Sequence, residues 1–390
     1  MSKKFTITYG GWYQRTTLHL SEIYSLFASG TSDLDLSKEK LKEFHKKLDI
    51  KKVSREAGYL EYIKIITVNG IEIRYYEDGL YVLELKADSI RGGKTQLEKY
   101  YNEALLPAIN YIFSLGAPTP KILANIKTVH PIVVNMTLKD VDGYKVDAKK
   151  YGKVYSQINF SDVTVYKTPT YIFVAISSKA TVSTDAVIEA QIFFREFKDQ
   201  LEKYLGIHRD IWEQISEIKE RKFIKGKEVG EIRNKLDSYK KTVSLIENRI
   251  NQMGSYIDTR ASVANHLKIK KYLLLFFQYK FEILTDSLDY ITELWKMTSD
   301  YLDNAIQVIV EIENKTTSAG IESLRIITTI GVIAGMAAYL TEDSIPKLTG
   351  SSLIYFGVLI IVTWLVNMLV LKTYKARKHK LGFTERTSNI

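Results

Sequence analysis

The chain has 390 residues, a formal net charge of +10 and no cysteine. The absence of cysteine excludes disulfides, thiolate metal sites and cysteine catalysis, and the length leaves room for a sizeable soluble core beside an extended helical region. The positive charge fits contacts with anionic lipid head groups, nucleotides or nucleic acid, and it fits ordinary solubility and membrane-side charge equally well.

Residues 1–182 combine β-rich runs with helical segments. Three successive runs are separated by Asn69-Gly70 and Asp78-Gly79, two-residue turns that β-hairpins favour. The predicted β-rich runs are 59–68, 71–76, 80–86, 130–138, 154–160, 163–167 and 170–178, and the predicted helices are 36–48 and 95–115. This alternation predicts a mixed α+β domain over residues 1–182.

Helix dominates after this domain. Five of the six prolines lie between Pro107 and Pro169, so the chain that follows is free to form long helices. Good N-cap residues at 183–185 start a predicted helical hairpin over 183–260. A stalk helix is predicted from Ala261 over 261–318. If it continued to Leu340 it would span about 80 residues, or ~120 Å at 1.5 Å per residue. Such a helix needs partners along its length, so we expect self-association.

Two apolar segments follow, Ile326 to Leu340 and Leu353 to Leu371. A helix needs about 20 apolar residues to cross the hydrocarbon core of a bilayer. We therefore expect an integral membrane protein with a two-helix transmembrane hairpin over 319–371. The short connector between the segments is slightly acidic and is the expected outer loop.

The basic tail at 372–390 sets the expected orientation. Positive residues flanking a membrane helix favour the cytoplasmic side. They are Lys372, Lys375, Arg377, Lys378 and Lys380. The N-terminal stretch lacks the apolar core of a signal peptide. We expect a multi-pass protein of the cell membrane with both termini, the α+β domain and the stalk in the cytoplasm.

Motifs near the end of the chain resemble those of the CorA family. Ile333-Ala334-Gly335 is similar to that family's ending of the first membrane helix, and Ser344 to Leu348 is similar to its outer-loop Met-Pro-Glu-Leu. The similarity at the level of motifs begins near Asp300. It implies a CorA-like funnel: an N-terminal cytosolic domain, stalk helices and a membrane hairpin in a homopentamer. It also implies passive transport of Mg²⁺, or of Zn²⁺, Co²⁺ or Ni²⁺.

One family signature is missing. Gly-Met-Asn should follow Ile-Ala-Gly, but this chain has Ala338-Tyr339-Leu340 there, and Gly335-Met336 is followed by Ala337. A ring of leucine or tyrosine lacks the carboxamide oxygens that would accept hydrogen bonds from a hydrated Mg²⁺. Selectivity for Mg²⁺ is therefore not carried over by the resemblance.

A stripe at three- and four-residue steps is the predicted pore lining. Its polar members suit a partly hydrated cation, and its apolar members suit a constriction. The predicted lining is Asn314, Thr317, Ile321, Leu324, Thr328, Gly331, Gly335, Tyr339 and Leu340. The resemblance makes Asn314 a polar ring near the cytosolic mouth and Asp303 a regulatory metal site between subunits. The alternative is a packing seam with scattered polar residues.

Acidic residues recur along the stalk. As rings in an oligomer they would hold divalent cations, and the alternative is a solvated face paired with Lys280 and Lys296. These residues are Asp286, Asp289, Glu293, Asp300, Asp303, Glu311 and Glu313.

Residues 89–95 end like a phosphate-binding loop, but Asp88 replaces the first glycine of the full pattern. Arg91 and Lys94 are the candidates for an anionic nucleotide ligand, and the alternative is an ordinary loop that starts a helix. The six histidines lack metal-ligand spacing, and no catalytic motif occurs in the sequence. We expect no enzyme activity and no covalent cofactor.

Three functions are consistent with the sequence. The first is a CorA-like divalent-cation channel gated by its cytosolic domain. The second is an effector channel of the same type, opened by a nucleotide-like messenger. The third is a membrane-anchored structural stalk. The expected partners are further copies of the chain, the bilayer, divalent cations and an anionic nucleotide, and nothing indicates direct binding of nucleic acid.

Overall fold

The computed structural model describes residues 5–12, 19–113, 132–139, 141, 144–160, 163–178, 184–221, 223–340, 350–376 and 378–380. The chain divides into two compact units. The first, here called the sheet unit, comprises residues 1–207 and 245–293; the second, the helical unit, comprises 208–244 and 294–390. An N-terminal α/β sheet domain is thus followed by long helices, as the sequence predicts at this level.

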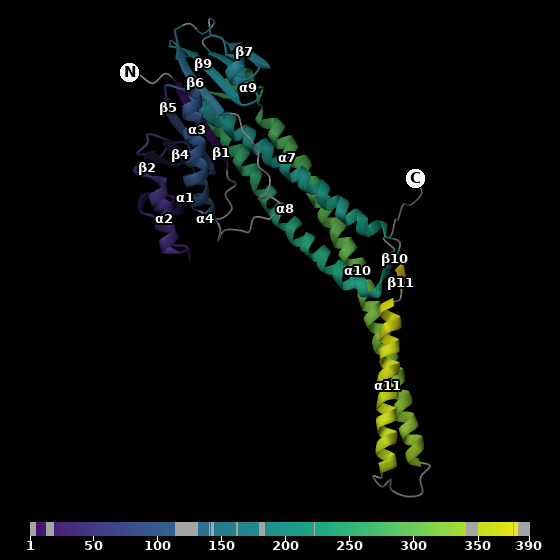
Figure 1. Cartoon of the computed structure of the whole chain (residues 1–390). Coiled ribbons are helices and arrows are strands. Elements are labelled where there is room, and N and C mark those ends of the chain that lie inside the picture. Colours follow the sequence, from purple (N-terminus) through teal and green to yellow (C-terminus); the bar gives the residue numbers. More distant parts are fainter. Residues whose placement is uncertain are drawn as a thin grey trace, which may run out of the picture. The chain divides into compact units, whose positions relative to one another are not determined.

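A nine-stranded sheet forms the centre of the sheet unit (Figure 1). Its spatial order is β2-β3-β4-β5-β1-β6-β9-β8-β7, and all pairs are antiparallel except β6 with β9. The strands are β1 (Phe5–Trp12), β2 (Ile50–Glu56), β3 (Tyr62–Thr67), β4 (Glu72–Tyr76), β5 (Leu80–Ala87), β6 (Ile132–Leu138), β7 (Ser156–Phe160), β8 (Val163–Lys167) and β9 (Tyr171–Ser177).

The two predicted hairpins are confirmed. Gly70 and Gly79 have φ values of 78° and 86°, a left-handed conformation that glycine adopts without steric cost. The later β-rich runs correspond to β6, β7, β8 and β9. The sequence did not predict β1, whose Gly10 is required by close packing, because a Cβ there would lie 2.7 Å from the backbone oxygen of Tyr81.

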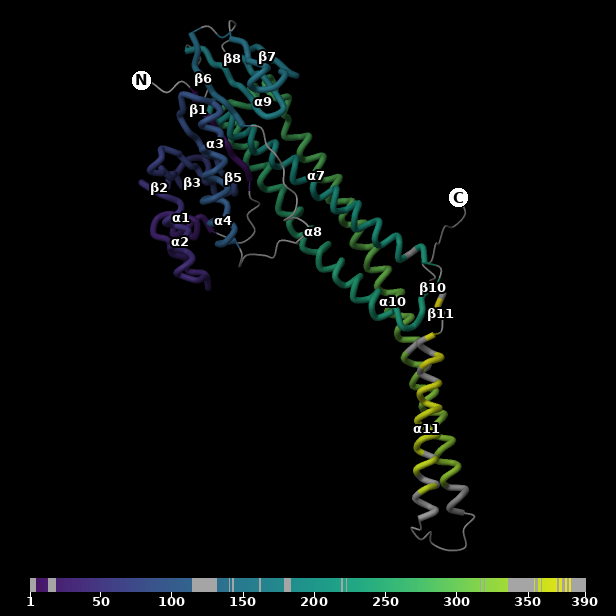
Figure 2. The backbone as a smooth tube through the Cα atoms, viewed as in Figure 1, coloured from purple at the N-terminus to yellow at the C-terminus, as the bar shows by residue number. Residues whose placement is uncertain are grey.

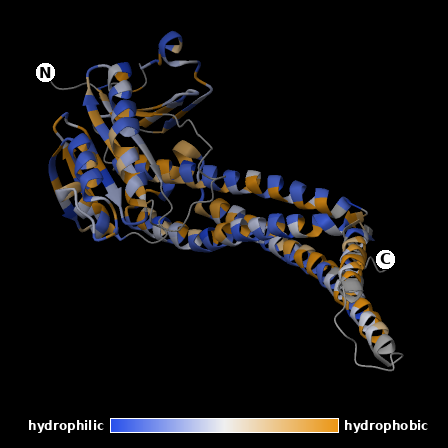
Figure 3. Ribbon diagram, turned by 60° about the horizontal axis from the view of Figure 1, so that its bottom comes forward, coloured by the Kyte–Doolittle hydropathy of each residue, from blue (hydrophilic) through white to orange (hydrophobic). Residues whose placement is uncertain are grey.

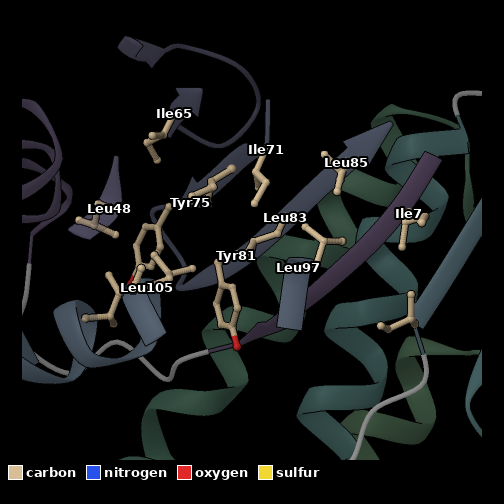
Figure 4. Packing of buried hydrophobic residues seen from close by; sticks show 14 of the residues in the cluster. Ile7, Leu48, Ile65, Ile71, Tyr75, Tyr81, Leu83, Leu85, Leu97 and Leu105 are labelled. Atoms are coloured by element: carbon tan, nitrogen blue, oxygen red, sulfur yellow. The ribbon is translucent and has the colours of Figure 1, made fainter. Parts of the chain in front are cut away.

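Short helices complete the core of the sheet unit. Figure 4 shows Ile7, Leu83, Leu85 and Leu97 among the buried side chains, which come from strands of the sheet and from α3. Burial of such side chains is the main stabilising contribution to a core of this kind. The helices are α1 (Leu20–Ser29), α2 (Lys38–Leu48), α3 (Ile90–Tyr100), a π-helical turn η1 (Tyr101–Leu105), α4 (Leu106–Phe113) and the single turn α6 (Ala148–Tyr151).

Long helices occupy the second half of the chain. They are α7 (Thr184–Glu220), α8 (Val229–His266), α9 (Lys270–Phe277), α10 (Phe281–Leu340) and α11 (Gly350–Ala376). Between α7 and α8 lie a short strand, β10 (Phe223–Lys225), and a 3₁₀ turn, η2 (Gly226–Glu228). The strand β11 (Lys378–Lys380), which follows α11, pairs antiparallel with β10.

The predicted stalk helix starting at Ala261 is wrong. The chain leaves the α-helix after His266 and again after Phe277, and the long helix α10 begins only at Phe281. Lys268 and Gln278 adopt left-handed φ values of 56° and 60° at these two breaks. Both residues are helix formers by composition, so no glycine or proline marks the breaks in the sequence.

A buried ion pair fixes α8 within the sheet unit. Arg260 of α8 donates two hydrogen bonds to Asp78, which lies in the turn before β5, at 2.5 and 2.7 Å. Both side chains are about 95% buried. The backbone oxygen of Asp78 also accepts a hydrogen bond from the indole nitrogen of Trp12 at 2.8 Å. The hairpin turn is thereby joined to both β1 and α8.

Candidate functional site

The environment of α10 changes along its length within the helical unit. Leu302 and Ile309 are fully buried, whereas Ile321 and Ile330 are 65% and 62% exposed. The change occurs just after Ile312, which is still buried. The helix therefore passes from a packed stalk into a segment whose apolar side chains have no cover in the single chain.

The described part of α11 has the same character. In Figure 3 this helix is coloured mostly as hydrophobic, whereas α7 and α8 alternate between hydrophilic and hydrophobic residues. Its large exposed apolar side chains are Ile354, Val358, Ile360, Ile361, Val362, Trp364, Leu365, Val366, Met368 and Leu369. Contiguous apolar surface on this scale marks contact with lipid or with another protein.

One described helix, α10, is long and apolar enough to cross a membrane, and α11 contributes the shorter described apolar stretch Ile360–Leu369. The predicted membrane location thus agrees with the structure in one respect, the presence of a candidate membrane span.

The exposed part of α10 and the helix α11 have similar lengths, and both begin near β10 and η2. Figure 2 shows α11 ending next to β10 and β11, and α11 contacts η2. Arg233, close to the start of α8, forms an ion pair with Glu313 of α10 at 2.6 Å. From there α10 continues to Leu340 over about the same length as α11, which has 27 residues. Each segment is therefore ~40 Å long at 1.5 Å per residue.

The predicted pore residues lie along the exposed half of α10. The described side chains of this set, Asn314, Thr317, Ile321, Leu324 and Thr328, are all exposed, as are Gly331 and Gly335. The hydroxyls of Thr317 and Thr328 donate to the backbone oxygens four residues earlier, at 2.9 and 2.8 Å. Their oxygen lone pairs remain available as acceptors.

Two predicted features of the outer mouth cannot be placed. Tyr339 and Leu340 form the last turn of α10, but their side chains lie outside the described residues. The connector with Ser344 to Leu348, which carries part of the family resemblance, also lies outside the described residues.

Asp303, the predicted regulatory metal ligand, forms an ion pair within the chain. Its carboxylate lies 2.5 Å from Nζ of Lys240 in α8, and the same lysine donates to Ser299 at 3.2 Å. The acidic stalk thus pairs in part with Lys240 of α8, whereas the alternative drawn from the sequence named Lys280 and Lys296. Among the described residues, no group of three or more histidine, aspartate or glutamate side chains could hold a metal ion.

Residues 89–95 start a helix, which is the alternative to a phosphate-binding loop that the sequence left open. Ser89 is the N-cap of α3, and its side chain accepts a hydrogen bond from the backbone N–H of Gly92, so Arg91 and Lys94 belong to the helix itself. Gly93 permits close packing, because a Cβ there would lie 2.2 Å from Ile7. Lys94 lies 3.7 Å from Glu98 and 5.0 Å from the ring centre of Tyr171. The structure therefore does not bring Arg91 and Lys94 together around a phosphate-sized loop.

A lysine-lined hollow that the sequence reading missed lies where α9 turns into α10. It has a volume of about 530 Å³, and Lys270, Lys271 and Lys280 are among its lining residues. A signal was present in the sequence, since Lys270, Lys271 and Lys280 fall within eleven residues. Only the two helix breaks bring them to one place.

Comparisons of the chain with protein-family models, with curated proteins and with solved structures found no match.

Proposed function

We propose that this chain is the subunit of a homo-oligomeric membrane channel that conducts cations passively. In this proposal α10 and α11 cross the bilayer as a hairpin, α10 lines the pore, and the sheet unit and the packed stalk lie in the cytoplasm. The arrangement is that of a CorA-like funnel, with five copies around the axis. No covalent chemistry is involved, because the membrane potential supplies the driving force.

The observation that carries the proposal is the continuity of α10. A single 60-residue helix passes from buried, ion-paired packing into an apolar segment with no cover in the single chain. Lipid covers one side of such a helix, and copies of the same helix cover the other. A closed ring of parallel helices meets both needs and leaves one stripe facing the axis.

The polar members of that stripe support conduction of cations. Asn314, Thr317 and Thr328 would each present a ring of amide or hydroxyl oxygens, separated by apolar rings of Ile321 and Leu324. Oxygen rings replace part of the hydration shell of a cation, and apolar rings gate by dewetting.

The test is ion flux through the purified protein in liposomes. Mg²⁺, Zn²⁺, Na⁺ and K⁺ are compared under an imposed potential, with protein-free liposomes as the control. We expect flux of at least one cation, and block by a cobalt hexammine complex if the carrier of current is a hydrated divalent ion. If no ion shows flux in the presence or absence of added ligands, the channel proposal fails and the membrane-anchored structural stalk becomes the better interpretation.

A second candidate function is favoured by the ion pairs of α10. Asp303 and Glu313 are each paired with a cation from α8. A metal ion at Asp303 would have to displace Lys240, which a regulatory divalent cation can do only at a cost in electrostatic energy. Gating by another class of ligand is therefore the alternative to gating by the transported ion.

A further inference from the structure

The hollow between α9 and α10 is built by residues from both sides of a helix break. Lys270, Lys271 and Leu274 come from α9, Tyr279 and Lys280 come from the connecting residues, and Glu282 comes from the first turn of α10. The volume of about 530 Å³ falls within the range of pockets that hold small organic ligands.

The charge of the hollow is strongly positive. Three lysines line it, against the single carboxylate of Glu282. Lys270 lies 3.8 Å from that carboxylate, and the two side chains are 46% and 70% exposed, so solvent screens the pair and leaves it weak. Among the described residues, Lys280 has no carboxylate within ion-pair distance.

Two lysines of the sheet unit, Lys271 of the hollow and Lys167, lie against aromatic rings. Nζ of Lys271 lies 5.3 Å from the ring centre of Phe160, and Nζ of Lys167 lies 5.3 Å from that of Phe277. Both distances are within the range of cation–π attraction. Burial lowers the pKa of Lys167, which shows that this amine is partly withdrawn from water. Packing against these rings therefore positions the side chains of Lys271 and Lys167.

The wall of the hollow is apolar as well as cationic. Leu274 is 44% exposed there, although its neighbour Leu273 is buried. The ring of Tyr279 is held by stacking on Phe194 and Phe277, at centre-to-centre distances of 4.8 and 5.6 Å. A ligand that places a ring or an alkyl group on this wall and negative charge near the lysines would satisfy both features.

We propose that this hollow is a binding site for a small organic phosphate. The lysines Lys270, Lys271 and Lys280 bind the phosphate oxygens, and Leu274 contacts the apolar part of the ligand. Lysine is well suited to this role, because its ammonium group acts as a compact charge toward phosphate.

Because the site lies at the start of α10, a bound ligand would regulate the pore; this step rests on the proposed channel function. α9 ends at Phe277, its C-cap Gln278 is left-handed, and α10 begins at Phe281. A ligand that contacts residues on both sides of this break favours one angle of α10 relative to α9, because it binds that arrangement more tightly than others.

Binding is measured by isothermal titration calorimetry on the full-length protein in a neutral detergent, with ATP and inorganic pyrophosphate as probes. A third titration with short-chain phosphatidylglycerol distinguishes a lipid head group from a soluble phosphate. We expect saturable binding of ATP that weakens as salt is added. The Lys270→Ala/Lys271→Ala/Lys280→Ala variant should bind about tenfold more weakly or worse, since three charge-assisted contacts are lost.

A matched control changes the net charge equally at exposed positions of α2. Lys38→Ala/Lys42→Ala/Lys46→Ala should bind ATP like the wild type, and replacing the three pocket lysines by arginine should preserve binding. Thermal melts check that all variants fold. If ATP, pyrophosphate and the lipid all fail to bind, or if the alanine and control variants bind equally, the site is refuted. Binding without any effect on liposome flux refutes the regulatory role and leaves the site intact.

Discussion

The buried pair of Arg260 and Asp78 joins α8 to the hairpin turn before β5. Burial alone would lower the pKa of Arg260, but the adjacent carboxylate raises it overall, so the guanidinium stays charged. Truncating one member of such a pair leaves an uncompensated buried charge, which typically costs about 3–5 kcal/mol.

The first prediction concerns this pair. Asp78→Ala should lower the free energy of unfolding of the full-length protein by about 3–5 kcal/mol, measured by denaturant titration in detergent. Arg55→Ala provides the control, because solvent screens the Arg55–Glu61 ion pair and its loss should cost much less stability than the loss of the buried pair. If both variants lost the same free energy of unfolding, Arg260 would have to find other hydrogen-bond partners, or water, once Asp78 is removed.

Glu196 of α7 provides a prediction of pH dependence. Burial raises the pKa of this carboxyl to about 7, although Arg195, 3.0 Å away, opposes the shift. The folded state therefore binds a proton that the unfolded state, with a pKa near 4.5, has already released. The stabilising effect of that proton is fully present below about pH 4.5, and it is lost as the pH rises toward 7.

The second prediction follows from this fall in stability with rising pH. The wild type should lose stability between about pH 5 and pH 7, by up to about 3 kcal/mol, and Glu196→Gln should flatten this part of the profile. Denaturant midpoints measured at half-unit steps of pH test the expectation. Glu202→Gln, on the same helix but mostly exposed, should keep the wild-type slope. A wild-type profile that is flat or rises over this range would contradict the prediction.

At the scale of single residues, the sequence predicted side-chain chemistry better than side-chain partners. Asp303 is acidic and exposed on the stalk, as expected, but its partner Lys240 is 63 residues away in the chain. No local pattern could have indicated that pair. Gly92-Gly93 suggested a phosphate-binding turn, whereas the need for close packing on Ile7 explains the second glycine.

At the scale of elements, strands and hairpins were predictable because their signals are local. Alternating apolar residues and Asn-Gly or Asp-Gly turns specify β3, β4 and β5 without reference to the rest of the fold. The edge strand β2, with the sequence IKKVSRE, carries mostly polar residues and has no such signal. The helix breaks near Lys268 and Gln278 were missed because tertiary packing, and no glycine or proline, determines them.

The third prediction concerns the break at Gln278. Gln278→Ile should destabilise the protein by roughly 1–2 kcal/mol, because a β-branched residue at φ 60° suffers a steric clash that glycine avoids. Gln278→Gly should be close to neutral, since relief of that strain offsets the greater entropy of the unfolded chain. Thermal unfolding of both variants measures the difference. If isoleucine is tolerated as well as glycine, the break does not require a left-handed residue.

At the scale of the whole molecule, the exposed apolar surfaces of α10 and α11 were predictable from hydropathy. The point at which α10 changes from buried to exposed, just after Ile312, was not predictable, because it depends on where α8 meets α10. The candidate pore face likewise depends on an arrangement of several copies that one sequence does not specify.

The fourth prediction tests that face and the association of copies together. Because the wild type has no cysteine, a single Asn314→Cys substitution supplies the sole thiol of each subunit. If Asn314 faces the axis of a ring, mild oxidation in membranes should produce disulfide-linked dimers. Lys315→Cys is the control, since the next residue points about 100° around the helix and should cross-link far less. Equal cross-linking at both positions would refute the assignment of the Asn314 face of α10 to the pore.

The pairing of β10 with β11 limits how many times the chain between them can cross a membrane. β10 precedes α10 in the chain and β11 follows α11, yet the two strands are hydrogen-bonded to each other. Hydrogen-bonded strands must lie on the same side of a bilayer. The chain between them therefore crosses an even number of times, so α10 and α11 either both span the membrane or both stay out of it. A protease or thiol-labelling map that found β10 and β11 on opposite faces would be incompatible with this fold.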